Sequence, residues 1–77
     1  MNGREEKITA AEVSEGAGGT FWVGIEQTWQ AHEALYQAAE ECGWGDSPRL
    51  HGLTQEEAGE RAEVINRTFG NLFRRTS

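Results

Sequence analysis

The chain has 77 residues, the size of one small domain, because chains divide into domains of about 100–200 residues. Its 7 Lys and Arg stand against 13 Asp and Glu, a net charge of −6. We therefore exclude a protein that binds nucleic acid through backbone phosphates, which needs a surplus of cations. Residues 1–77 are expected to form a single small acidic helical domain with no direct nucleic-acid partner.

The N-terminal third is compatible with two structures. Thr9 and Glu12 have the spacing of a capping box, which predicts a short helix that ends at the glycine cluster 16–19. The segments 8–13 and 20–25 instead contain Thr, Val, Ile, Phe and Trp, which favour strands joined by the same glycines. We prefer the short helix or an irregular segment, which gives an all-α fold. The alternative is an α+β fold with an N-terminal β-hairpin.

A first amphipathic helix is predicted over residues 21–42. Apolar and aromatic residues recur there in steps of three and four, and glutamates and glutamines occupy the opposite side. The apolar side consists of Trp22, Ile25, Trp29, His32, Tyr36 and Ala39. Gly43 is a suitable C-terminal stop, and a turn-rich segment follows it.

A second helix is predicted over residues 55–74. Thr54 and Glu57 form a capping box at its start. One side of this helix carries apolar residues at helical spacing, namely Ala58, Ala62, Ile65, Phe69, Leu72 and Phe73. Two ion pairs between residues four apart are expected, Glu57–Arg61 and Glu63–Arg67. The two helices then pack as an antiparallel helical hairpin.

The sequence indicates a cytoplasmic protein with no membrane partner. Its first segment contains no apolar run of the kind found in signal peptides, and no stretch approaches the ~20 apolar residues of a membrane span. The single cysteine, Cys42, cannot form an internal disulfide, which fits a reducing compartment.

No catalytic or metal-binding set is recognisable. Cys42 follows His32 by ten residues, about 15 Å along a helix, and His51 has no evident third group to orient it. One cysteine and two histidines lack the spacing of a zinc site. The glycine cluster has Gly19 where a phosphate loop needs lysine. We therefore expect a protein that is not an enzyme, with no catalytic residues, metal or cofactor.

Two features of the sequence point to protein binding. Trp22, Trp29 and Tyr36 are spaced by seven residues, so they fall on one line of the predicted helix, and a two-helix core cannot enclose all of them. Residues 8–48 contain seven acids and no Lys or Arg, so one side of the domain is negative. Exposed aromatic side chains anchor protein interfaces, and acidic groups steer them toward basic surfaces.

The leading hypothesis is a regulator or inhibitor that docks this acidic, aromatic helical face onto a basic surface of another protein. Small acidic inhibitor proteins encoded by phages and mobile elements act in this way, and they serve only as an analogy for this kind of function. The predicted partner-binding residues are Trp22, Glu26, Trp29, His32, Glu33, Tyr36, Glu40 and Glu41. We also expect a homo-oligomer, because a symmetric copy covers exposed aromatic stripes at low cost.

The alternative hypothesis is an oligomeric protein that binds a nucleotide-like small molecule. Aromatic side chains would stack on the ring of this ligand, and C-terminal arginines would bind its anionic group. The arginines in question are Arg61, Arg67, Arg74 and Arg75.

Overall fold

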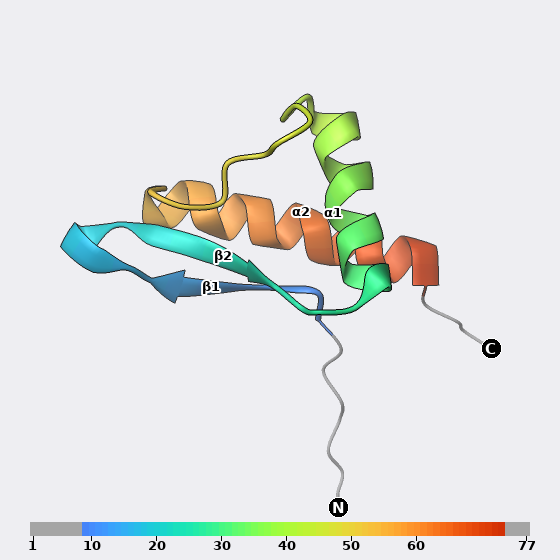
Figure 1. Ribbon diagram of the computed structural model, residues 1–77, viewed down its shortest axis with the longest axis horizontal. Coiled ribbons are helices and arrows are strands. Elements are labelled where there is room, and N and C mark those ends of the chain that lie inside the picture. The colour runs from blue at the N-terminus through green and yellow to red at the C-terminus, as the bar shows by residue number, and fades with distance from the viewer. Residues whose placement is uncertain (1–8, 74–77) are drawn as a thin grey trace, which may run out of the picture.

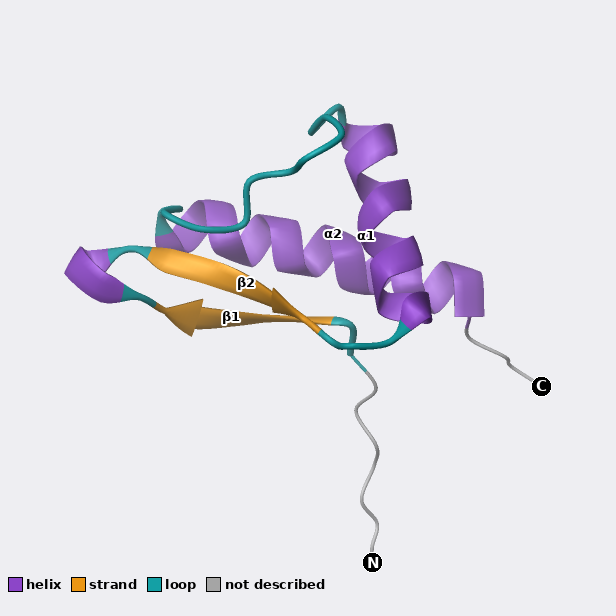
Figure 2. Ribbon diagram, viewed as in Figure 1, coloured by secondary structure: helices purple, strands orange, loops and turns teal. Residues whose placement is uncertain are grey.

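The fold is α+β, so the preferred all-α prediction is wrong and the alternative with an N-terminal β-hairpin is correct. The computed structural model describes residues 9–73. Its elements follow in the order β1 (Ala11–Glu15), a 3-10 turn (Ala17–Gly19), β2 (Phe21–Ile25), α1 (Trp29–Cys42) and α2 (Gln55–Phe73). Helix α2 contacts both strands and α1. In Figure 1 it runs along the hairpin and crosses behind α1, so the prediction of an antiparallel helical hairpin is also wrong. Figure 2 shows the two strands as a pair of neighbouring arrows that lies along α2.

The hairpin replaces the short helix expected from Thr9. Strand β1 runs antiparallel to β2, with Ala11 opposite Ile25, and the turn uses Gly18 and Gly19 at φ of 67° and 78°. At these positive φ values glycine has no steric cost. The backbone N–H groups of Ala10 and Ala11, which an N-terminal helix would direct along its axis, donate instead to the side chain of Asn66 in α2. A tertiary contact therefore outweighs the local capping pattern.

Helix α1 begins at Trp29 rather than at residue 21. Thr28 is its N-cap, since the Thr28 hydroxyl accepts a hydrogen bond of 3.1 Å from the N–H of Ala31. Gly43 ends the helix in the left-handed conformation with φ of 71°, as predicted. The segment 21–25 contains only aromatic, β-branched and glycine residues, and five such residues fit a strand as well as one helical turn.

Helix α2 begins where its capping box predicts. The N–H of Glu57 donates to the Thr54 hydroxyl at 3.1 Å, and the N–H of Thr54 donates to the Glu57 carboxylate at 3.0 Å. Because Glu57 is used in this way, the expected Glu57–Arg61 ion pair is not formed, whereas Glu63 and Arg67 lie 3.7 Å apart. The predicted last residue of the helix, 74, lies outside the described residues.

The core is small and consists largely of alanines. Ala31, Ala34, Ala38 and Ala58 are fully buried, and Ile65 is the one large side chain among residues 9–73 that is completely enclosed. Alanine lets elements approach closely, but each one buries little apolar area. The larger aromatic side chains therefore lie around this core instead of within it. No described helix combines the length and the apolar character required to cross a membrane.

Candidate functional site

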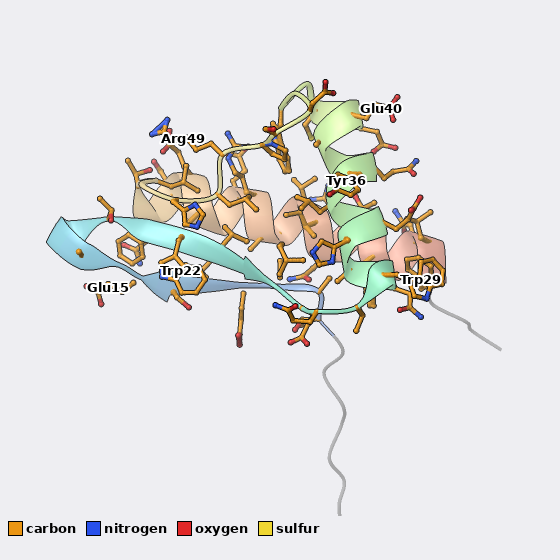
Figure 3. All side chains as sticks on the ribbon, in the orientation of Figure 1. Glu15, Trp22, Trp29, Tyr36, Glu40 and Arg49 are labelled. Atoms are coloured by element: carbon orange, nitrogen blue, oxygen red, sulfur yellow. The ribbon has the colours of Figure 1, made fainter. Side chains whose placement is uncertain are left out.

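The outward side of α1 carries the most exposed apolar side chains in the described part of the chain. Trp29 is 69% exposed and Tyr36 is 57% exposed. Steps of four, three and four residues place Trp29, Glu33, Tyr36 and Glu40 on one line of the helix, and all four are exposed. In Figure 3 the labelled Trp29, Tyr36 and Glu40 follow one another along α1. We call these four residues the acidic aromatic face.

The opposite side of α1 explains why the aromatics remain outside. That side is buried and consists of Ala31, Ala34, Leu35, Ala38 and Ala39. A helix with one buried side packed by small residues leaves its other side in water. The sequence pattern instead predicts that Trp29 and Tyr36 lie on the apolar side, because large aromatic residues dominate such a pattern, and this prediction is wrong.

Trp29 is held in place although it is exposed. Its ring meets Phe73 of α2 edge to face, with 5.6 Å between ring centroids, and Phe73 in turn lies 5.4 Å from Phe69. Leu72 is 42% exposed in the same last turns of α2. An anchoring side chain that is already ordered loses less conformational entropy on binding.

A hollow of about 610 Å³ lies at the C-terminal end of the acidic aromatic face. Its lining residues are Tyr36, Ala39, Glu40, Gly43, Gly45 and Asp46. The hollow therefore combines one aromatic ring, two carboxylates and the bare backbone of two glycines. The sequence-based site omitted Asp46, although the turn chemistry from Gly43 onward signals that the chain folds back at this point.

His32 and Glu41 flank the acidic aromatic face. His32 is half-buried, and its Nδ1 donates a hydrogen bond of 2.9 Å to the carbonyl oxygen of Thr28. The same carbonyl oxygen also accepts a hydrogen bond from the backbone N–H of His32 at 3.2 Å, so the ring is held against the first turn of α1. Glu41 is exposed to one side of the line.

Trp22 and Glu26 do not belong to this face. Trp22 lies in β2, and Glu26 follows that strand, so the prediction that Trp22 shares a helical line with Trp29 and Tyr36 is wrong. The Trp22 ring stacks on His51 with 6.3 Å between centroids, and it covers Gly24 so closely that an added Cβ would lie 3.0 Å from it. Figure 3 shows Trp22 on the hairpin, well apart from Trp29.

The described arginines do not converge on a common site. Arg61 lies over the Trp44 ring at 4.6 Å, and its buried Nη1 has no hydrogen-bond partner among residues 9–73. Arg67 pairs with Glu63. Arg74 and Arg75 lie outside the described residues. Neither of the two hollows described here has an arginine in its lining.

The titratable side chains of the described residues offer no metal-binding cluster. Over residues 9–73, no group of three His, Cys, Asp or Glu side chains is arranged to hold a metal ion. Cys42 is an exposed free thiol.

No protein-family model, curated protein or solved structure matches the chain. Its function must therefore be argued from the geometry of its surfaces.

Proposed function

We propose that the protein is a binding module whose acidic aromatic face docks onto a basic surface of another protein and thereby inhibits or regulates that protein. The observation that carries this proposal is the exposure of Trp29 and Tyr36 in line with Glu33 and Glu40. Large exposed apolar side chains cost free energy in water, and an interface is the usual place where they become buried.

The hollow beside Tyr36 favours a cationic group from the partner. A Lys or Arg side chain entering it would meet the side chain of Tyr36 and the carboxylates of Glu40 and Asp46. Cation–π contact and carboxylate pairing both strengthen when water is displaced. The chemistry of this hollow therefore matches a basic surface better than an acidic or apolar one.

The charge of α1 supports the same kind of partner. Its sequence contains three acids and no Lys or Arg, and the whole chain carries −6. Such a surface accelerates encounters with basic proteins and opposes encounters with acidic ones. We place the interaction in the cytoplasm because the exposed thiol of Cys42 suits a reducing compartment.

The test begins with a photo-crosslinker. The full chain with p-benzoylphenylalanine at position 36 is irradiated in host lysate, and the captured protein is identified, purified and titrated with the unmodified chain. We expect Trp29→Ala and Tyr36→Ala each to weaken binding by about 2 kcal/mol, or roughly 30-fold, as anchors at the centre of an interface do.

Trp22→Ala is the matched control, because Trp22 is also an exposed tryptophan but lies on the hairpin. It should change the affinity less than twofold. The double variant Glu33→Lys/Glu40→Lys should slow association and flatten its salt dependence, whereas Glu56→Lys/Glu60→Lys, on exposed positions of α2, should not. Equal losses for the three aromatic variants would contradict the proposal.

A further inference from the structure

The hairpin has one closed edge and one edge that is partly open. On the β2 side, the N–H of Phe21 donates to the carbonyl of Leu53 at 2.9 Å, and the N–H of Leu53 donates back to Phe21 at 3.0 Å. The N–H of Val23 donates to the carbonyl of Leu50 at 2.9 Å. The segment before α2 therefore covers the β2 edge as a short third strand does.

On the β1 side, a single side chain closes the beginning of the edge. The Asn66 Oδ1 accepts hydrogen bonds of 2.8 Å and 2.9 Å from the N–H groups of Ala10 and Ala11, and its Nδ2 donates to the carbonyl of Ala11 at 3.0 Å. The amide of Asn66 thus makes the contacts that the backbone of a neighbouring strand would make.

The rest of the β1 edge is open. In an antiparallel pair, residues alternate between those whose backbone groups face the partner strand and those whose groups face away. Phe21 and Val23 bond outward to the Leu50–Leu53 segment, so their partners Glu15 and Val13 also direct their N–H and C=O groups away from β2. Among residues 9–73, nothing bonds to these four groups of Val13 and Glu15. Val13 is also 38% exposed.

The charges along this edge select what can pair with it. Glu12 and Glu15 are exposed, and no Lys or Arg occurs in β1 or β2. If a second copy paired through the open groups, Val13 would face Glu15 of that copy. The two Glu15 side chains would then be diagonal neighbours about 7–8 Å apart. Self-pairing therefore brings like charges together, whereas an extended segment with Lys or Arg brings opposite charges together.

We propose that the open edge of β1 binds an extended basic peptide segment, which adds to the hairpin as a third antiparallel or parallel strand through Val13 and Glu15. Main-chain hydrogen bonds supply the affinity in this mode, and alternate side chains supply the specificity. This site is separate from the acidic aromatic face of α1 and does not rest on the function proposed above.

The outer face of the hairpin provides room for the side chains of such a segment. A hollow of about 460 Å³ lies there, and its lining includes Glu12, Ser14, Trp22 and Gly24. Because side chains alternate along a strand, every second residue of the added segment would project on this side, next to Glu12. The remaining residues would project on the side of Val13 and Glu15.

The experiment uses the full chain and a defined probe, an acetylated and amidated heptapeptide that alternates Arg and Val. We expect the peptide to shift the backbone amide resonances of Val13 and Glu15 and to slow their hydrogen exchange at least fivefold. Ser14, whose amide is already paired with β2, should change less. A version of the peptide that is N-methylated at every amide keeps the side chains and loses the donors, and should bind at least tenfold more weakly.

Matched substitutions separate charge at the edge from charge of the whole chain. Glu15→Lys should weaken binding of the basic peptide at least threefold, whereas Glu60→Lys, at an exposed position of α2, should leave it within twofold. Equal binding of the methylated peptide, resonance shifts confined to α1, or an edge already occupied by a second copy would each overturn the proposal. Loss of binding with Trp29→Ala would do the same, because that result would place the peptide on the acidic aromatic face.

Discussion

Asn66 shows how one side chain decides the structure of a distant segment. Its amide makes three hydrogen bonds to the backbone of Ala10 and Ala11, in a partly buried position. A two-stranded hairpin alone is marginally stable in water. Asn66 lies on α2 and binds the N–H groups of Ala10 and Ala11 and the carbonyl of Ala11. Without it these backbone groups would be partly buried and unpaired, so Asn66 fixes the position of β1 against α2.

We predict that Asn66→Ala lowers the free energy of unfolding by about 2–3 kcal/mol, because each hydrogen bond contributes about 1 kcal/mol and the orphaned backbone groups add a desolvation cost. Urea denaturation measures the loss. Asn71→Ala, at an exposed position of the same helix, is the control and should cost less than 0.5 kcal/mol. If the two variants are equally stable, Asn66 does not act as the clamp described here.

At the scale of single elements, the sequence predicts the helices better than it predicts the hairpin. The Thr54–Glu57 capping box and the Gly43 stop act locally, so they are visible in the sequence and confirmed in the structure. The three-and-four spacing of Trp22, Ile25 and Trp29 predicts a helix that includes residues 21–25. That spacing is fortuitous in a strand of five residues. The Thr28 N-cap was the overlooked signal that a new element begins there.

Two glycines in or beside helices allow a test with the same substitution and opposite results. Gly59 lies inside α2, where an added Cβ would meet no atom within 4 Å, so Gly59→Ala should raise the free energy of unfolding by about 0.5–1 kcal/mol. Gly43 needs a φ of 71° to end α1, so Gly43→Ala should lower it by about 1 kcal/mol or more. Thermal unfolding followed by circular dichroism measures both changes in stability. If the two variants change the free energy of unfolding in the same direction, the prediction is wrong.

At the scale of the whole molecule, the candidate site could be predicted in part. The sequence shows that aromatic side chains outnumber the places available in a small core, and Trp29 and Tyr36 are indeed exposed. It does not show which ones, because that choice depends on the close packing of alanines between α1 and α2. The hollow next to Tyr36 could not be predicted from the sequence either, because it forms only when the chain after Gly43 turns back beside the helix.

Self-association remains a prediction, and the charge of the chain determines how strong the dimer is and how it depends on salt. Two copies that bury Trp29 and Leu72 against each other also bring two acidic surfaces together, and the total charge of each copy is −6. We expect a weak dimer whose formation increases between 20 and 500 mM NaCl, because salt screens the repulsion. Sedimentation velocity at both salt concentrations measures this. A dimer that is tight at 20 mM NaCl would show that the interface lies away from the acids.

The clamp between Asn66 and the first strand also affects how the chain acquires its structure during synthesis. The donor and acceptor groups that it joins are 55 and 56 residues apart in sequence, and the cover of the β2 edge arrives only with Leu53. A ribosome releases the hairpin long before it releases either partner, and long-range contacts of this kind slow folding. The β2 edge of the nascent hairpin is therefore uncovered until residues 50–53 emerge, and the start of β1 lacks its Asn66 contact until most of α2 has followed.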